Sequence, residues 1–379
     1  MLAGTRARYS LYQVFGVLFL CLLLYIEITS LPSLYSSPVL RMPHTFFSAI
    51  RTAHLINLLC FVDLDDKSYT IKNNAGKRCD ISSRLRLALR LATSTRGVGT
   101  KWQVKNIPPF PAWVTSADGC SVNRMRFLIR QTAISMWQYL ALDLLYFGYF
   151  ARFSEIQSLT HAPGTEFLGY YSPTAIQQGA RLAIAIVFIL TLRLLLDWAY
   201  RCFSVISVGI RLTPPEDWPP LFGSIMNAYT LRNFWGAVKR YTELVLMFTL
   251  SAGFHYMSAI WSDFPVHTGF LLIMTVNPFI IMLEDAIRSY VGRYVREGNG
   301  LLCYVLGNET FCRLIGYCWV LFAGLYVTAP WCAFPIMRLP VYNTVLAPHS
   351  LVERLGLTMG TLTVGSLGVA LHYIFRMEF

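Results

Sequence analysis

Charged residues are scarce in this 379-residue chain. Asp, Glu, Lys and Arg together make up 14%, whereas hydrophobic residues make up 55%. A soluble domain carries about 25% charged residues, so the shortage argues against that class. The ten-residue alternating segments of a membrane β-barrel are lacking as well. Long apolar runs recur along the whole length, which predicts an all-α, polytopic membrane protein forming one domain over residues 1–379.

Organised cysteine chemistry is also lacking. The nine cysteines form no CxxC pair and no Cys/His cluster. The sequence therefore predicts no disulfide framework, no metal site and no bound cofactor.

Acidic residues are fewer than basic ones, 20 against 32, which gives a net charge of +12. Such an excess can mark a nucleic-acid partner, but in a membrane protein it is better explained by basic loops retained on the cytosolic side. We therefore expect a lipid bilayer and no nucleic acid as the partner of the basic residues.

Apolar runs near the roughly 20 residues that a bilayer requires predict about eight membrane spans. They cover residues 11–28, 45–62, 127–150, 174–200, 242–261, 267–283, 314–334 and 355–375. The second span is the weakest, because Arg51 and His54 interrupt it. The sixth is expected to kink at Asn277–Pro278, since proline removes a helix hydrogen bond. The last is rich in Gly and Thr, as close helix packing favours.

The distribution of basic residues predicts which side each loop occupies. With both termini in the cytosol, the cytosolic loops hold roughly six times as many Lys and Arg as the lumenal loops, as the positive-inside rule expects. The lumenal set is Arg41, Arg152, Arg338 and Arg354, and the two long cytosolic loops are 64–126 and 198–241. The glycosylation acceptor at Asn308 falls in the cytosol, so we expect it to be unused.

One histidine, His255, lies in the middle of an apolar run, in residues 248–255 (FTLSAGFH). Helical spacing places Phe248, Ser251 and His255 on one face. Ionisable groups at membrane depth are rare and suggest a functional site. The plainer alternative, a histidine that only ties two helices together by a hydrogen bond, stays open on equal terms. Elsewhere, Arg193 and Asp197 are four residues apart, which predicts a local ion pair.

The two cytosolic loops carry the remaining patterns. Residues 83–92 (SRLRLALRLA) predict an interfacial amphipathic helix, followed by the glycine-containing run 96–100 (RGVGT). The second loop contains 218–224 (WPPLFGS) and 228–236 (AYTLRNFWG), where Thr230 is expected to cap a short helix beginning at Leu231. Basic and aromatic residues that simply anchor loops at the membrane surface are the alternative interpretation.

These stretches together resemble a known family. WPPLFGS, AYTLRNFWG and an apolar run ending in SAGFH, with RGVGTKWQVKNIPPFP upstream, are similar to the wax-synthase-like branch of the membrane-bound O-acyltransferases. More narrowly, they resemble fungal members that acetylate hydroxyl groups of terpenoid and meroterpenoid natural products. The resemblance covers residues 84–290 most strongly.

The resemblance implies an acyl-CoA donor, here acetyl-CoA as a co-substrate, an apolar alcohol acceptor, a catalytic histidine within the membrane and a location in the endoplasmic reticulum. His255 is the matching histidine. The branch often has Trp-His-Gln shortly after FWG, where this chain has Lys239, Arg240 and Tyr241. That departure removes a second histidine and leaves the catalytic partner of His255 open.

On this basis His255 is expected to act as general base, because a neutral imidazole accepts a proton near pH 7. The developing oxyanion needs a hydrogen-bond donor, and Asn233 and Ser251 are the candidates. No serine or cysteine lies in a nucleophile motif, so we expect direct acetyl transfer without an acyl-enzyme.

Four further residues are candidates for binding acyl-CoA. Arg232, Lys239 and Arg240 lie on the cytosolic side of the histidine span and are expected to meet the phosphates of CoA. Trp235 is expected to pack against the donor. Ordinary positive-inside charge is the competing interpretation for each of the three cations.

Two alternative functions remain. A long-chain wax ester synthase would share the fold and the histidine and differ in the size of its tunnel. A membrane transporter would also have many spans and intramembrane charges, but the two halves of this chain show no internal repeat of the kind that transporters often have. The acceptor, its stereochemistry and the oligomeric state leave no signal in the sequence.

Overall fold

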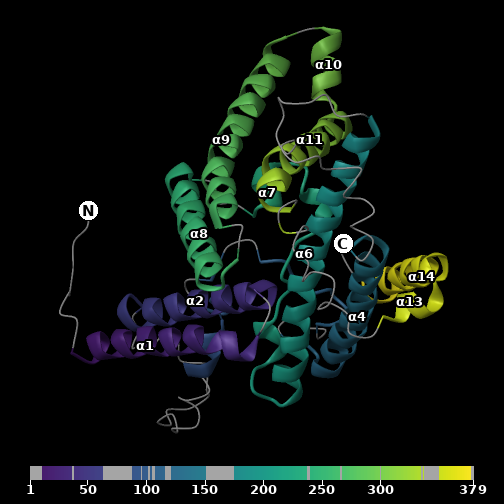
Figure 1. Cartoon of the computed structure of the whole chain (residues 1–379). Coiled ribbons are helices and arrows are strands. Elements are labelled where there is room, and N and C mark those ends of the chain that lie inside the picture. The colour runs from purple at the N-terminus through teal and green to yellow at the C-terminus, as the bar shows by residue number, and fades with distance from the viewer. Residues whose placement is uncertain are drawn as a thin grey trace.

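The computed structural model describes most of the chain as helices (Figure 1). The described residues are 11–35, 38–62, 88–94, 96–100, 103–104, 107–115, 121–150, 175–236, 240–264, 267–298, 300–333, 336 and 350–376. Within these ranges the one strand-like contact is an isolated bridge between Thr115 and Val122. The predicted all-α class is therefore confirmed.

Eight helices form the main body. They are α1 (Leu11–Leu34), α2 (Pro38–Cys60), α4 (Arg124–Leu145), α6 (Ala175–Gly209), α8 (Tyr241–Trp261), α9 (His267–Glu297), α11 (Glu309–Ala323) and α14 (Leu357–Phe375). Shorter elements are α7 (Leu231–Phe234), α10 (Leu301–Gly307), α13 (Leu351–Leu355) and the 3₁₀ turns Pro215–Asp217 and Ile225–Asn227. The π-helical segments η2 (Tyr146–Phe150) and η5 (Gly324–Ala333) continue α4 and α11.

Every predicted span coincides with one of these helices, and five of them are long and apolar enough to cross a membrane: α1, α6, α8, α9 and α14. The other three fall short of that standard. Helix α2 carries Arg41, Arg51 and two histidines, α4 carries several charged residues, and α11 passes into π-helix after 15 residues. Five apolar helices thus support membrane association, and the total of eight spans stays a prediction.

Helices α6 and α9 continue past the C-terminal ends of their predicted spans. Helix α6 continues to Gly209, so the second loop begins at Ile210 rather than at residue 198. The predicted span ended at residue 200, just before the charged Arg201. That side chain is buried, pairs with Asp197 and donates to Gln131 of α4. Helix α9 passes through Pro278 to Glu297, and the Asn277 side chain donates to the Ile273 carbonyl at 2.7 Å within the interrupted turn.

The contact between α4 and α6 also corrects the predicted local ion pair. Asp197 accepts from Arg201 at 2.8 Å and from Gln138 of α4 at 2.6 Å. Arg193 instead donates to the Gly223 carbonyl at 3.0 Å and lies over the ring of Phe222. The chain after α6 folds back along the helix and supplies an acceptor for Arg193, which spacing along one helix cannot reveal.

Helix α14 packs closely on α4, as its Gly and Thr content predicted. The Trp137 indole donates to the Val364 carbonyl at 2.9 Å. A Cβ added at Gly368 would lie 3.1 Å from the Trp137 ring, so glycine permits this approach. The neighbouring Asp143 accepts from the backbone of Leu351 and Val352 and fixes α13 at the end of α4.

Helices α1 and α2 lie side by side and run across the lower end of α8 in Figure 1, rather than alongside it. Glu27 of α1 joins them, because its carboxylate accepts from His44 at 2.8 Å, from Ser48 at 2.7 Å and from Arg51 at 2.7 Å. Helix α2 in turn contacts α8. The N-terminal pair therefore reaches the histidine helix through α2.

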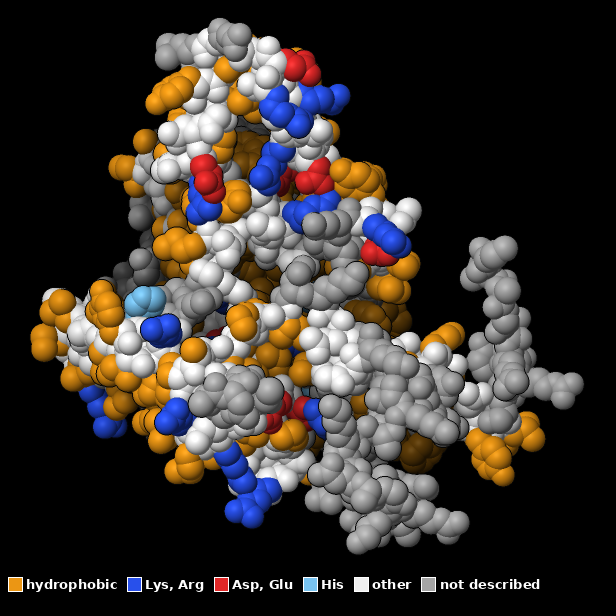
Figure 2. All heavy atoms as spheres, turned by 180° about the vertical axis from the view of Figure 1, so that it is seen from behind, with side chains coloured by type: hydrophobic (Ala, Val, Ile, Leu, Met, Phe, Trp, Pro, Cys, Tyr) orange, Lys and Arg blue, Asp and Glu red, His pale blue; other side chains and the backbone are white. Residues whose placement is uncertain are grey.

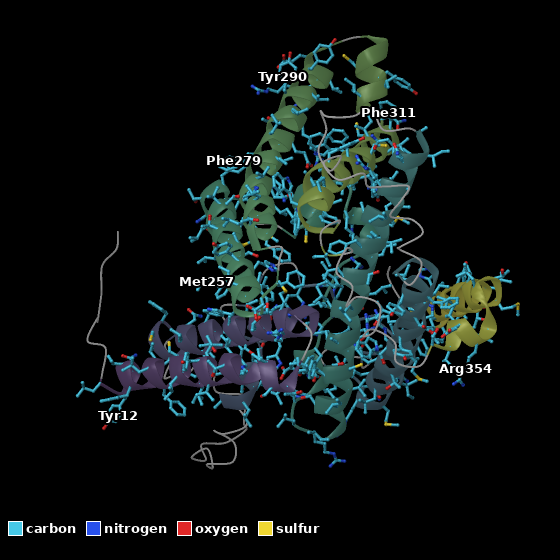
Figure 3. The ribbon with its side chains drawn as sticks, in the orientation of Figure 1. Tyr12, Met257, Phe279, Tyr290, Phe311 and Arg354 are labelled. Carbon is cyan, nitrogen blue, oxygen red and sulfur yellow. The ribbon has the colours of Figure 1, made fainter. Side chains whose placement is uncertain are left out.

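Large apolar side chains cover much of the outer surface, whereas charged ones gather in the upper part of Figure 2, over α9 to α11. Tyr12 of α1, Met257 of α8 and Phe279 of α9 lie on outer faces (Figure 3) and are 87%, 42% and 64% exposed. Such apolar surface is the kind that a lipid bilayer covers.

Candidate active site

The imidazole of His255 is enclosed between two phenyl rings. The ring of Phe46, on α2, stacks on one side with centroids 4.2 Å apart and planes 18° from parallel. The ring of Phe270, on α9, stacks with a centroid distance of 5.1 Å and an angle of 20°. The consecutive helices α8 and α9 and the distant α2 therefore meet at this histidine.

The α8–α9 hairpin positions one of these rings. The two helices run antiparallel, because Ser251 contacts Met274 and His255, one turn later on α8, contacts Phe270, one turn earlier on α9. Leu244 lies in one buried cluster with Ile281 further along the same register. Only five residues, 262–266, separate the two helices in the sequence.

Helix α2 is held beside His255 by two polar contacts with the end of α8. The Thr45 hydroxyl donates to the Ser258 carbonyl at 3.2 Å. Arg41 forms an ion pair with Asp263 at 3.1 Å. Both contacts lie within about two helical turns of His255, so they set the place at which α2 crosses α8.

The Nδ1 atom of His255 is buried and makes no hydrogen bond. A buried acceptor or donor left without a partner carries a penalty of about 1–3 kcal/mol. A polar group that binds there would supply the missing partner. The plainer interpretation expected a hydrogen bond between His255 and another helix, and Nδ1 forms none.

Ser251 and Asn233, the predicted oxyanion donors, occupy different places. Ser251 lies one turn before His255 on α8, and its hydroxyl lies 3.8 Å from the Met274 sulfur, which is a weak acceptor. Asn233 lies in α7 and donates to the Asn227 carbonyl at 2.8 Å, within its own loop. The structure thus places Ser251 beside the histidine and ties Asn233 to the loop.

Helix α7 forms as predicted, with Thr230 at its N-cap accepting from the Asn233 backbone N–H at 3.0 Å. It docks on α9, where the Leu231 N–H donates to Glu284 at 2.8 Å. Arg232 forms an ion pair with Asp285 on the same helix. This candidate for CoA binding therefore already has an anionic partner.

Trp235 connects the loop to both helices of the hairpin. Its indole N–H donates to Asn277 of α9 at 3.0 Å, and its ring meets Phe248 of α8 edge-on at 5.7 Å. Phe248 precedes His255 by two helical turns, a rise of roughly 10 Å. The loop thus reaches the histidine helix, but well along its axis from the imidazole.

The remaining cationic candidates are less well placed. Arg240 is 81% exposed at its side chain and pairs with Glu243 at 3.2 Å. Lys239 lies outside the described residues. In the part of the chain that the structure describes, no group of three or more His, Cys, Asp or Glu residues is arranged to hold a metal ion.

The two loop signatures fold against each other. Arg96, from RGVGT, donates to the carbonyls of Pro219 at 2.8 Å and Pro220 at 3.0 Å, and to the Tyr200 hydroxyl. Arg90 pairs with Asp217 beside them. A cavity of about 40 Å³ lies between these groups, and both arginines facing it are already paired. The cavity is roomy enough for a few water molecules.

Sequence reasoning missed Phe46 and Phe270. Phe270 had a detectable signal, because a hairpin with a short connection pairs positions near the ends of its two helices. Phe46 had none in a single sequence, since it lies 209 positions before His255 (255 − 46) and in the span with the weakest apolar character.

Comparison with known proteins shows that the chain is similar to fungal acetyltransferases. It is 27% identical over 391 aligned positions to acetyltransferase pyr8 of Aspergillus fumigatus, covering 94% of this chain and 89% of that protein. It is 29% identical to acetyltransferase atnC of an Arthrinium species, with coverage of 98% and 92%. It is 28% identical to acetyltransferase TRI7 of Fusarium sporotrichioides, with coverage of 85% and 80%.

No family model matches the chain. No solved structure matches it either. The likeness to the first two of these enzymes nevertheless extends over 94% and 98% of the chain. The predicted enzyme class is therefore confirmed: the chain is an acyltransferase, and it is similar to fungal acetyltransferases.

Proposed function

We propose that the protein is a membrane-bound O-acetyltransferase of fungal secondary metabolism, which moves the acetyl group of acetyl-CoA to a hydroxyl of an apolar terpenoid or meroterpenoid. The observation that carries the proposal is the unpartnered, buried Nδ1 of His255 in an aromatic surrounding. The names of the similar enzymes support acetyl as the transferred group. The sequence resemblance supports the membrane-bound O-acyltransferase superfamily and the wax-synthase-like branch.

In the proposed reaction, His255 takes the proton of the acceptor hydroxyl while that oxygen attacks the thioester carbonyl of acetyl-CoA. A carbon–oxygen bond forms, the carbon–sulfur bond breaks, and the proton passes from the imidazolium to the leaving CoA thiolate. General base catalysis of this kind contributes roughly a hundred- to ten-thousandfold. Placing both substrates together is worth a further 7–11 kcal/mol or so.

A hydroxyl donating to Nδ1 would remove the penalty of the unpartnered atom, which supports an alcohol as the ligand at this edge of the ring. Ser251 is the better placed of the two oxyanion candidates, because it lies one turn away and its present contact is weak. Asn233 would first have to leave the Asn227 carbonyl.

The donor is proposed to enter from the cytosolic loops. Arg232, Lys239 and Arg240 remain candidates for the phosphates of CoA, and Trp235 for packing against the donor. Of these, Arg240 has the most exposed guanidinium, so it needs the least rearrangement to meet an anion. Arg232 would have to bind Asp285 and the phosphate at the same time, or release Asp285.

Contacts between loops support the proposed topology, in which the chain crosses eight times with both termini in the cytosol. Arg96 and Pro219 belong to loops assigned to the cytosol, and they are in contact. Arg41 and Asp263 belong to segments assigned to the lumen, and they form an ion pair. An endoplasmic reticulum location is part of the proposal.

The test uses the purified protein in mild detergent with acetyl-CoA and a panel of apolar alcohols, with acetylated products detected by mass spectrometry. The matched variants are His255→Gln, which keeps a polar side chain, and His255→Ala. Thermal unfolding should show that both variants are folded, and kcat should fall at least a hundredfold in both. Retained activity in the folded variants would overturn the role of His255 as general base.

Donor choice separates the alternatives. A ligand that binds only the folded protein stabilises it by RT ln(1 + [L]/Kd), roughly 2.7 kcal/mol at a hundred times Kd. We expect acetyl-CoA to raise the melting temperature. A shift with palmitoyl-CoA alone would indicate a long-chain wax ester synthase instead, and no shift with either, in a cooperatively melting protein, would reopen the transporter interpretation.

A further inference from the structure

The clamp around His255 consists of Phe46 on one face of the imidazole and Phe270 on the other. Both rings are nearly parallel to the imidazole, at 18° and 20°. Stacked aromatic rings at such separations attract each other and exclude other groups from the ring faces. The two nitrogens lie at the edge of the imidazole, and Nδ1 is buried there without a hydrogen bond.

The two clamping rings are themselves fixed. Phe270 is buried and stacks on Phe264, with centroids 6.2 Å apart. Phe46 is carried by α2, whose neighbouring Thr45 donates to the Ser258 carbonyl of α8. Because Ser258 lies one turn from His255 on the same helix, the crossing of α2 is set directly beside the imidazole.

We propose that Phe46 and Phe270 are positioning residues that hold the plane of the His255 imidazole for proton transfer. The proposal rests on the proposed function of His255 and adds α2 to the active site. It predicts that removing one ring face lets the imidazole rotate about its χ2 angle. Misplacing a reacting group by about 1 Å can lower a rate a hundredfold.

The experiment compares Phe46→Leu with Phe47→Leu. Phe47 is the next residue on α2 and is 52% exposed. Its ring meets that of Phe46 edge-on at 5.7 Å but does not stack on the histidine, so the same substitution there controls for the loss of aromatic packing on α2 without removing a ring from the imidazole. Phe46→Tyr keeps the ring and serves as the conservative variant. For each protein, kcat and the KM for acetyl-CoA are measured together with the melting temperature.

For Phe46→Leu we expect kcat to fall roughly ten- to a hundredfold while KM for acetyl-CoA changes less than about twofold. Phe46→Tyr should keep kcat within about threefold of the parent protein, and Phe47→Leu should leave it unchanged. If Phe46 had only a structural role, Phe46→Leu would lower the melting temperature without lowering kcat selectively at an almost unchanged KM.

Three results would overturn the proposal. The first is an unchanged or increased kcat in Phe46→Leu, which would make the ring a barrier to substrate entry instead. The second is an equal loss in Phe47→Leu. The third is a loss in Phe46→Tyr as large as in Phe46→Leu. Should Phe46→Leu fail to fold, Phe270→Leu tests the other face by the same criteria.

The outcome for His255→Gln separates this proposal from the proposed function. If His255→Gln stays active, the general-base role fails, and the clamp fails with it. If His255→Gln is inactive while Phe46→Leu and Phe270→Leu both keep full activity, the clamp alone is refuted. His255 would then act as general base without being positioned by the two phenyl rings.

Discussion

At the scale of single residues, the arginines proposed to bind CoA differ in how firmly the fold already holds them. Arg232 is 16% exposed at its side chain, pairs with Asp285 and lies over the ring of Tyr241. Arg240 is 81% exposed and pairs with Glu243. Arg232 is therefore held by contacts that stabilise the fold, whereas Arg240 is mainly a surface charge.

Arg232→Gln should accordingly lower the free energy of unfolding by about 1.5–3 kcal/mol, the usual range for a hydrogen bond to a charged group. Arg240→Gln should change it by less than about 0.5 kcal/mol. Thermal unfolding checks both values, and the KM for acetyl-CoA of Arg240→Gln shows whether this arginine meets the donor. Equal stability losses in the two variants would contradict the distinction.

Asp217, outside the membrane-spanning helices, gives a dependence of stability on pH. Burial raises the pKa of its carboxyl above the ordinary value of 3.8, although the paired Arg90 lowers it. A carboxyl whose pKa is raised by folding contributes most to stability below its unfolded pKa, and that contribution is lost as pH rises through the folded pKa. The second carboxylate oxygen is buried without a hydrogen bond, which agrees with this direction.

Asp217→Asn, which cannot ionise, is therefore expected to lack this pH dependence. The stability of the parent protein minus that of the variant should decrease as the pH is raised from about 4 to 7. Melting temperatures of both proteins across this range provide the measurement. A difference that grows with pH would mean that pairing with Arg90 outweighs burial.

At the scale of elements, α7 shows how a short helix is held in place. Four residues cannot form a stable helix alone. Thr230 caps it, Glu284 accepts from its first N–H, and Trp235 donates to Asn277. The cap and the two hydrogen bonds to α9 therefore supply what helix propensity cannot.

The bond between Trp235 and Asn277 can be measured by a double-mutant cycle with Trp235→Phe and Asn277→Leu. A coupling of about 0.5–1.5 kcal/mol in the free energy of unfolding is expected, as for an ordinary intramolecular hydrogen bond. Asn233→Ala at the exposed side of the same helix is the control and should show no coupling with Asn277→Leu. Additive effects in the main cycle would remove this bond as an anchor.

The sequence predicted where the helices lie better than it predicted where they end. Hydropathy located the main helices, and capping chemistry located α7 at Thr230. The end of α6 was missed, because Arg201 reads as a surface charge in one dimension but is buried against Gln131 of α4. The contact with Gln131 comes from a helix that is distant in sequence, so the local sequence gives no sign that Arg201 is buried.

The candidate site was likewise predicted in part. His255 was singled out because an ionisable residue in an apolar run is unusual, and Ser251 followed from helical spacing. Phe46 and Phe270 were not, because two phenylalanines among the chain's 25 look like ordinary apolar residues until the fold places them on the imidazole.

At the scale of the whole molecule, the predicted topology can be tested with glycosylation. Asn308 caps α11, where its side chain accepts from the Phe311 N–H. Our topology places it in the cytosol, so the parent protein made in microsomes should not change mobility after endoglycosidase treatment. A shift that disappears in Asn308→Gln would overturn the assignment of sides.

A positive control comes from the chain itself. Val345→Thr turns Asn343-Thr344 into a glycosylation acceptor within the loop assigned to the lumen. This variant should gain one glycan, which endoglycosidase removes. Glycan at neither position would indicate that the segment around residue 345 is not lumenal, and would reduce the number of crossings.

The arrangement of three helices around one imidazole also has a consequence for biosynthesis. Phe46 leaves the ribosome 224 residues before Phe270 (270 − 46), which at roughly 5–20 residues per second is an interval of about 11–45 s. For most of that interval α2 is already synthesised, yet neither His255 nor Phe270 exists. A nascent chain halted before α9 therefore has no assembled catalytic centre, and the enzyme becomes competent only in the last part of its translation.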